Sequence, residues 1–419
     1  MHILVDHGRS ENFGDAAMVQ GTLSALTKKY PTHTYALSSD GLTDCDVLSF
    51  PSVTEIPTYH MRPQWKDPFL HAQPTKGKRS TGAGHLWPMT RYSWTWPMVN
   101  IARKIQRVLY TRYWPSMDDL SELYIQSDGQ CIPLLDWCNQ FDAGLIPGGL
   151  ITDEFTASLY RQCLLMHAFH KLRKPFYLYG VQCGPFTKTQ LQKQATEAMQ
   201  TATVCTVRSP DFPKDTGATF IHDMSMGIIP SPHTNEWLQK HKIQPGKFLT
   251  YHMRSSFYNS SMRRYIPYYA SLLTQLSQTL HMPLVHVPIS LKESDNDRHW
   301  GTDIAKYLSK VDHFEIEDVT LKDTALIKGI IGQSHGIIGV SYHACIFALS
   351  QGVPAINIHA SKHYSHKAKG LVETFHDDRI SLCIPECHIE NAYAQCLSLF
   401  ADAAFSEASY SEWNDMLVL

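Results

Sequence analysis

Short apolar runs alternate with helical patterns along most of the chain, and this feature restricts the fold more than any other. Residues 2–6 form the first apolar run, which ends at an acidic residue. A loop through Gly14 follows, and then a helix is expected over residues 15–30 because its apolar residues recur at helical spacing. Asp15 is expected to cap that helix. Repeated alternation of this kind predicts an α/β fold with parallel sheets.

The same alternation continues on both sides of a Pro-, Ser- and Asn-rich stretch near Pro230. Before it, strands are expected at 142–146, 175–179, 203–207 and 218–222, with helices at 154–171 and 188–201. After it, strands are expected at 247–252, 283–288, 335–340 and 354–358, with helices at 262–280, 320–330, 343–351 and 390–404. A chain of 419 residues is too long for one ordinary domain. We therefore predict two Rossmann-like domains, residues 1–230 and 231–419, that face each other across a cleft.

Composition excludes several classes of protein. Hydrophobic residues make up 43% and charged residues 18% of the chain, which is globular rather than disordered composition. The net charge of −2 gives no reason to expect a nucleic-acid partner. The N-terminus lacks a basic region and a long apolar region, and the chain has no membrane-spanning apolar stretch, so we expect a cytoplasmic protein. Cys383, Cys387 and His388 have no second pair of ligands at zinc spacing, so we expect no metal.

One segment, residues 60–115, breaks the α/β pattern. Residues 61–115 contain ten of the 37 Lys and Arg residues but only one of the 39 Asp and Glu residues, and five of the nine tryptophans lie there too. Interleaved Trp and basic side chains suit an interface with anionic lipid headgroups or with sugar rings. Two alternatives are open. The segment either contacts the inner face of a membrane or a lipid-linked acceptor, or it is an irregular insertion whose tryptophans pack onto the domain.

Five short segments fall where the carboxyl ends of strands are expected, which is where open parallel sheets bind ligands. Each has an ordinary structural explanation, since Gly-rich turns are common in α/β proteins and an Arg at a strand end often forms a salt bridge. Their occurrence together at corresponding strand ends is what points to a site. The segments are Asn12-Phe13-Gly14-Asp15, Gly148-Gly149, the turn from Gly180 to Pro185, Arg208, and Ser341-Tyr342-His343-Ala344.

The order and spacing of these segments resemble the polysaccharide pyruvyl transferase family from Gly8 to about Leu371. The resemblance rests on an Asn-x-Gly-Asp turn, a glycine-rich turn before a polar helix, a Gly-x-x-x-Gly-Pro turn, a Val-Arg pair, a segment around His-Ala, a Gly-x-Pro turn and a His-Lys loop. In this chain they are Asn12 to Asp15, Gly148-Gly149, Gly180 to Pro185 with Gly184, Val207-Arg208, Ser341 to Ala344, Gly352 to Pro354, and His366-Lys367.

The resemblance implies two Rossmann-like domains in a GT-B-like arrangement. It also implies transfer of a pyruvyl group from phosphoenolpyruvate to a sugar of a cell-surface polysaccharide or its lipid-linked precursor, with formation of a ketal. It implies that Arg208 and Lys367 bind the donor and that His343 is the catalytic acid–base. Phosphoenolpyruvate is a compact trianion, and Arg can grip a carboxylate or phosphate with two parallel hydrogen bonds. The implied scheme uses phosphoenolpyruvate as a co-substrate and needs no cofactor. The turn residues Asn12, Gly14, Asp15, Gly148, Gly149 and Gly184 are expected beside the donor.

Ser341 departs from the family, which has Arg at that position. Losing a charge-assisted pair costs about 1.5–3 kcal/mol. We expect Arg254, Lys362 or Lys369 to supply the missing cation. Two other functions are open on the sequence: a glycosyltransferase that uses a nucleotide sugar in the same cleft, and a degenerate family member that binds a glycan without catalysis.

Overall fold

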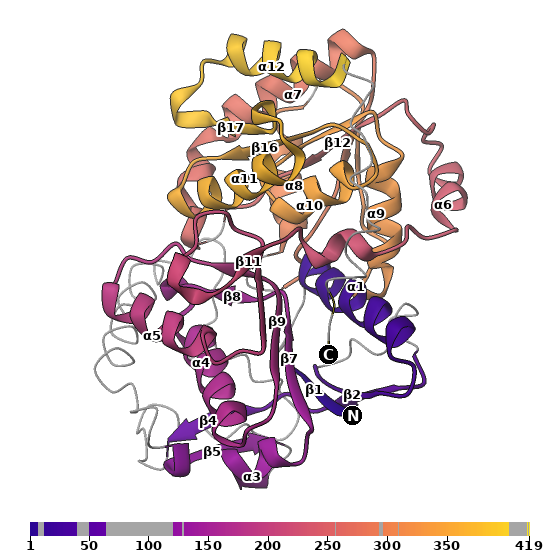
Figure 1. Ribbon diagram of the computed structural model, residues 1–419. Coiled ribbons are helices and arrows are strands. Elements are labelled where there is room, and N and C mark those ends of the chain that lie inside the picture. The colour runs from indigo at the N-terminus through magenta and orange to yellow at the C-terminus, as the bar shows by residue number, and fades with distance from the viewer. Residues whose placement is uncertain are drawn as a thin grey trace.

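The computed structural model describes residues 1–6, 12–39, 50–63, 120–127, 130–255, 257–292, 296–308, 310–401, 417 and 419. These residues form two Rossmann-like α/β domains, one above the other in Figure 1. All strands of the lower sheet precede residue 230, and all strands of the upper sheet follow it.

The lower sheet has eight strands, and every pairing in it is parallel. Its order is β11-β10-β9-β7-β1-β2-β3, with β8 paired to β9. The order reverses at β1, so the first crossover helix starts at the switch point where such sheets bind ligands. The strands are β1 (His2–Asp6), β2 (Thr34–Ser38), β3 (Val53–Ile56), β7 (Ala143–Pro147), β8 (Leu150–Ile151), β9 (Phe176–Cys183), β10 (Val204–Val207) and β11 (Thr219–Phe220).

The upper sheet has six parallel strands in the order β14-β13-β12-β15-β16-β17. Numbered along the domain, this is the order 3-2-1-4-5-6 of a doubly wound Rossmann sheet. Its switch point lies between β12 and β15, where His252 and Gly339 end neighbouring strands. The strands are β12 (Leu249–His252), β13 (Leu284–His286), β14 (His313–Glu315), β15 (Gly336–Gly339), β16 (Ala355–His359) and β17 (Ser381–Cys383).

Helices connect these strands (Figure 1). None of those within the described ranges is both long and apolar enough to cross a membrane. They are α1 (Phe13–Lys29), α3 (Leu134–Asn139), α4 (Thr156–Lys171), α5 (Thr189–Met199), α6 (Thr234–Lys240), α7 (Ile266–Leu280), α8 (Asp297–Ala305), α9 (Thr324–Gly332), α10 (Tyr342–Leu349), α11 (Lys362–Phe375) and α12 (Ile389–Ala401).

A small antiparallel sheet interrupts the lower domain between β3 and β7. Its strands are β4 (His60–Pro63), β5 (Leu123–Ser127) and β6 (Gln130–Pro133). It marks the place where the sequence departs from the α/β pattern. Most of the basic, Trp-rich segment lies outside the described residues, so its contact with a membrane or lipid stays a prediction.

Helix α1 joins the two domains. Its buried face packs against a 3-10 turn (Met224–Gly227) and against α9 and α10, and one continuous apolar core includes residues of both sheets. In Figure 1 the indigo α1 lies directly below the orange helices of the upper domain. The C-terminus also returns to the lower domain, where the Leu419 amide donates to the Tyr30 hydroxyl over 3.2 Å.

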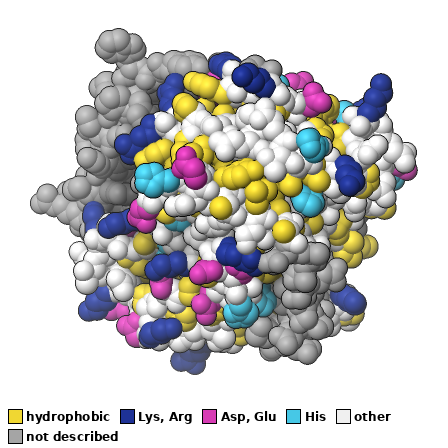
Figure 2. All heavy atoms as spheres, turned by 90° about the horizontal axis from the view of Figure 1, so that it is seen from above, with side chains coloured by type: hydrophobic (Ala, Val, Ile, Leu, Met, Phe, Trp, Pro, Cys, Tyr) yellow, Lys and Arg dark blue, Asp and Glu magenta, His cyan; other side chains and the backbone are white. Residues whose placement is uncertain are grey.

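The outer face of the upper domain carries mixed charge. Figure 2 shows its Lys and Arg side chains interspersed with Asp and Glu, with hydrophobic atoms scattered between them. This mixing agrees with the balanced overall charge.

The sequence located most of the long elements, but it missed the helix α11 and the strand β2. The strand expected at 2–6 is confirmed, and the helix expected at 15–30 is confirmed with an earlier start at Phe13. The strand expected at 218–222 is reduced to two residues, β11. The helix expected from residue 262 begins as an α-helix only at Ile266. Short elements such as β14 and β17 were not predicted, because three residues are too few for a period to show.

Candidate active site

Two helix N-termini meet at the boundary between the domains. Asn12 caps α1, not Asp15 as expected, because its Oδ1 accepts hydrogen bonds from the amides of Gly14 (2.8 Å) and Asp15 (3.3 Å). Ser341 caps α10, and its Oγ accepts from the Ala344 amide. The positive ends of both helix dipoles therefore point into the same region, which favours an anion there.

Gly14 and His343 are in direct contact across this boundary. A Cβ atom at position 14 would lie 2.0 Å from Nδ1 of His343, far closer than any real contact. Glycine is therefore required at position 14 by the imidazole packed against it. His343, in the first turn of α10, is 7% exposed.

Arg208 comes directly after β10, as the sequence predicted, and its side chain is almost fully buried. Its guanidinium forms an ion pair with Asp223 and lies 3.1 Å from Nε2 of His343. It also stacks over the ring of Tyr342, with 5.3 Å between Cζ and the ring centroid. Because an Arg Nη1 can only donate, the facing Nε2 of His343 is the acceptor in this contact.

Burial and charge set the protonation of this cluster. Burial lowers the pKa of His343 to about 4; Arg208 acts in the same direction, and Asp223 opposes it only in part. Burial alone would raise the pKa of Asp223, but Arg208 and His343, together with Ser225, hold it below its usual value. At neutral pH the cluster is thus an Arg–Asp ion pair beside a neutral imidazole.

Lys367 approaches from the upper domain. The family resemblance suggested a loop at this position, but the residue lies in the second turn of helix α11, because Ser361 caps a continuous 14-residue helix. Burial, followed by the charges of Arg208 and Arg254, lowers the pKa of Lys367 to about 7. Its ammonium lies over the ring of Tyr364, and no acceptor for it occurs in the described part of the chain.

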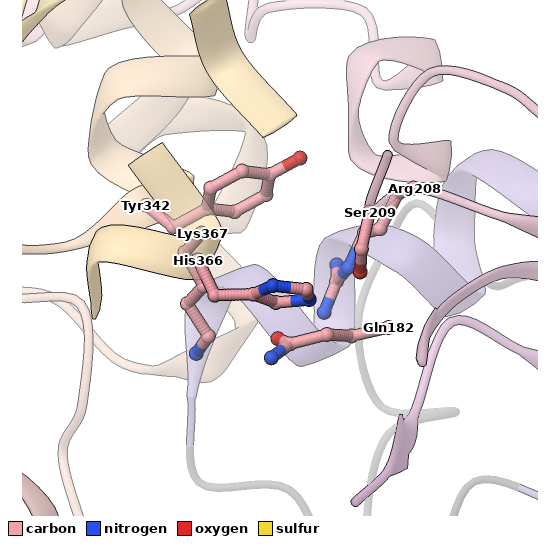
Figure 3. A pocket seen from close by; sticks show the side chains of 6 residues that line it. All are labelled: Gln182, Arg208, Ser209, Tyr342, His366 and Lys367. Carbon is pink, nitrogen blue, oxygen red and sulfur yellow. The ribbon is translucent and has the colours of Figure 1, made fainter. Parts of the chain in front are cut away.

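A small space separates Arg208 from Lys367. Figure 3 shows Lys367, Tyr342 and His366 on one side of it and Arg208, Ser209 and Gln182 on the other. Its volume is about 10 Å³, which is room for about one water molecule. A larger ligand enters only when these walls move apart. His343 does not line the space but lies behind Arg208.

The other predicted site residues are placed less centrally. The charge of Asp15 acts on both His343 and Lys367. Gly148 has a left-handed φ of 73° and packs against Met18, which in turn touches Arg208. Gly149 packs near Gln162.

Gly184 lies outside the small space. It borders a separate surface groove beside Phe186 and Phe212. The structure therefore does not bring Gly184 together with Arg208 and Lys367.

Of the three cations expected to replace the arginine missing at Ser341, only Arg254 is suitably placed. It is mostly buried, and its charge reaches Lys367. Lys369 is instead paired with Asp211 at 2.7 Å in an exposed position, and Lys362 is exposed.

Sequence reasoning missed several of these residues. Asp223 carried one usable signal, since it closely follows the strand expected at 218–222. Tyr342, His366 and Gln182 carried no signal beyond their positions next to predicted residues. Among the described residues, no group of three or more His, Cys, Asp or Glu side chains is arranged to hold a metal ion.

Comparison with solved structures identifies the fold. The chain is similar to a putative UDP-N-acetylglucosamine 2-epimerase from Listeria monocytogenes, with a TM-score of 0.51, 11% identity, and coverage of 97% of this chain and 90% of that one. It is also similar to MnaA of S. aureus in its co-structure with UDP, with a TM-score of 0.52, 11% identity, and coverage of 97% and 91%. At such low identity these likenesses show the two-domain GT-B-like fold alone.

A search of curated proteins finds no significant match. The family model described as polysaccharide pyruvyl transferase, however, matches residues 12–359, which include Asn12, Arg208 and His343. This match spans most of both domains, and the chain therefore belongs to the polysaccharide pyruvyl transferase family.

Proposed function

We propose that the protein transfers the pyruvyl group of phosphoenolpyruvate to two hydroxyls of a saccharide and forms a cyclic ketal. The observation that carries the proposal is the convergence of Arg208 and Lys367 on one small space, which Tyr342 at the N-terminus of α10 also lines.

The electrostatics of the site favour a compact anion. The cations Arg208 and Arg254 both lower the pKa of Lys367, so the positive charges are close enough to repel one another. Asp223 pairs with Arg208 and Asp297 lies beside Arg254, so neither of these carboxylates is paired with Lys367. A bound phosphate or carboxylate would relieve the repulsion and return Lys367 to its charged form, because an anion favours the protonated amine.

In the proposed reaction, one hydroxyl oxygen attacks C2 of the enol while C3 gains a proton and becomes a methyl group. The C2–O bond to phosphate then breaks, and the second hydroxyl oxygen bonds to C2. The two hydroxyls lose two protons in total. In the net reaction C3 gains one of them, and inorganic phosphate takes the other. The products are the ketal and inorganic phosphate, so no oxidant or reductant is needed.

His343 is suited to accept the hydroxyl proton. Its Nε2 is unprotonated at neutral pH and faces Arg208. When the donor draws the Arg208 guanidinium toward its phosphate, this nitrogen becomes available to the acceptor hydroxyl. Arg208 and Lys367 would stabilise the charge on the departing phosphate.

The proposal is tested by thermal unfolding with phosphoenolpyruvate, UDP, CMP or inorganic phosphate added separately. A ligand at a hundred times its dissociation constant stabilises the folded state by about 2.7 kcal/mol. Phosphoenolpyruvate should raise the melting temperature more than phosphate does. A rise with UDP or CMP alone would favour a nucleotide-sugar glycosyltransferase instead, and no rise with any ligand would favour a non-catalytic protein.

A further inference from the structure

A buried Asp–His pair lies next to the candidate active site but outside it. His252 ends β12, Asp297 begins α8, and both side chains are fully buried. Nε2 of His252 lies 2.9 Å from Oδ2 of Asp297. Nδ1 of His252 accepts a hydrogen bond of 3.1 Å from the Ser341 amide. Nε2 therefore carries the proton, and His252 is the neutral tautomer that donates to Asp297.

This arrangement contains Asp, His and Ser, but it is not a nucleophilic triad. The imidazole binds the backbone amide of Ser341, while the Ser341 hydroxyl caps α10 by accepting from the Ala344 amide. Among the described residues no base faces the hydroxyl, so the pair acts on the backbone. It fixes the turn from β15 into α10, two residues before His343.

The same carboxylate also anchors a loop of the upper domain that contacts α1. Oδ2 of Asp297 accepts from the amides of Ile289 (2.9 Å) and Ser290 (2.5 Å). The carbonyl of Ile289 in turn accepts from the Phe13 amide over 2.8 Å, and Ser290 forms a β-bridge with Asn12. This loop of the upper domain thus receives the N-terminus of α1, whose Gly14 packs against His343.

Asp297 also lies close to Arg254, on the side of the site where the donor is expected to bind. Nε of Arg254 lies 3.7 Å from Oδ1 of Asp297, and the charge of Arg254 acts on Lys367. One buried carboxylate is therefore linked to α10, to α1 and to Arg254. Burying a carboxylate costs free energy unless the group is paired and hydrogen-bonded. The carboxylate of Asp297 accepts hydrogen bonds from His252 and two backbone amides, and it lies beside Arg254.

We propose that Asp297 and His252 are positioning residues that fix His343 against α1 and direct Arg254 toward the donor. The inference rests on the proposed function for its catalytic consequence, but its structural consequence can be measured without any substrate.

Two substitutions separate the two bonds of His252. Asn places its carbonyl oxygen near the position of Nδ1, so His252→Asn keeps the acceptor for the Ser341 amide and loses the bond to Asp297. Gln places its amide near Nε2, so His252→Gln keeps the donor to Asp297 and loses the acceptor for Ser341. His286→Gln is the matched control, because the buried His286 pairs with the partly exposed Glu315 at 3.0 Å in the same sheet, and none of its contacts among the described residues is with α10 or α1.

Turnover of phosphoenolpyruvate is the first readout. His252→Gln should lower kcat by about 10- to 100-fold with little change in KM, because a catalytic group displaced by about an ångström loses rate rather than ground-state binding. His252→Asn should recover most of that loss. Asp297→Asn should lower kcat and also raise KM for phosphoenolpyruvate, because Arg254 loses its charged partner. The control should match the wild type.

Hydrogen exchange of the backbone is the second readout and needs no ligand. The Ser341 amide should exchange about tenfold faster in His252→Gln, and the Phe13 amide about tenfold faster in Asp297→Asn. Unchanged exchange at both amides, or the same fall in kcat in His286→Gln, would overturn the proposal. If the wild type neither binds nor turns over phosphoenolpyruvate while the exchange changes appear, the proposed function fails and the positioning network stands.

Discussion

Gly14 in α1 lies directly against the imidazole of His343 in α10, so two residues 329 positions apart meet at the boundary between the domains, next to Arg208. We expect Gly14→Ala to force α1 and α10 apart. Overpacking of this kind costs about 1–3 kcal/mol of stability, and the displaced imidazole should reduce kcat by about tenfold or more. Activity assays and thermal unfolding measure both effects.

The control for that substitution is Gly21→Ala, in the same helix. A Cβ there would meet the carbonyl of Met224 rather than His343. It should lower the melting temperature while the folded enzyme keeps its kcat. Equal loss of kcat in both variants would show that helix packing, and not the contact with His343, limits activity.

Lys367 should control the alkaline limb of the pH profile. Burial and then the nearby arginines lower its pKa to about 7, so the free enzyme loses this charge as the pH rises through neutrality. Because kcat/KM reports the free enzyme, it should fall above about pH 7. Lys367→Arg keeps its charge at all accessible pH values. In that variant the fall in kcat/KM should move to higher pH. A fall at the same pH as in the wild type would show that another group causes it.

Lys328 should make the protein more stable as the pH rises above neutrality. This lysine is almost fully buried in α9, and its Nζ donates to the carbonyl of Met226 over 2.7 Å. Burial lowers its pKa to about 7 from 10.5. Between these values the unfolded chain holds more protons than the folded protein, so the free energy of unfolding increases with pH.

Denaturant unfolding between pH 7 and pH 8 tests this prediction. Burial also raises the pKa of cysteines such as Cys163, and these thiols lower the free energy of unfolding mainly above that range. Lys328→Met should show a smaller increase in the free energy of unfolding than the wild type. Lys322→Met, at an exposed position, is the control and should keep the wild-type slope. The same slope in Lys328→Met would contradict the assignment.

The pair between Lys369 and Asp211 connects the domains at 2.7 Å but should contribute little. Both side chains are more than half exposed, and exposed pairs of this kind contribute at most about 1 kcal/mol. Lys369→Met should therefore change the free energy of unfolding by less than about 1 kcal/mol. A larger loss in a urea titration would mean that this surface contact holds the domains together.

The fold could be predicted because its signals are local. Apolar runs indicated the strands, and the segment from Asn12 to Asp15 indicated the start of α1, although the cap is Asn12 rather than Asp15. Arg208 and His343 were found because each follows a strand. Asp223 and Asp297 were not, because their roles arise only when distant segments meet. Asp297 forms a hydrogen bond with His252, 45 positions away, and the residues around neither side chain indicate this partner.

The departure at Ser341 shows the same limit. The sequence indicates a lost cation, but only the fold shows that Ser341 caps α10 and that Arg254 stands near the donor side. Lys362, Lys369 and Arg254 were equivalent candidates on the sequence. Their different exposure and pairing separate them in the structure.

Calorimetric titration of phosphoenolpyruvate into the wild type and Lys367→Met tests the central claim most directly, with Lys369→Met as the control. We predict one binding site per chain in the wild type and the control, and binding about ten- to a hundredfold weaker in Lys367→Met, as expected for the loss of one charge-assisted contact. Absence of binding to the wild type, or equal affinity in Lys367→Met, would contradict the assignment of this site to phosphoenolpyruvate.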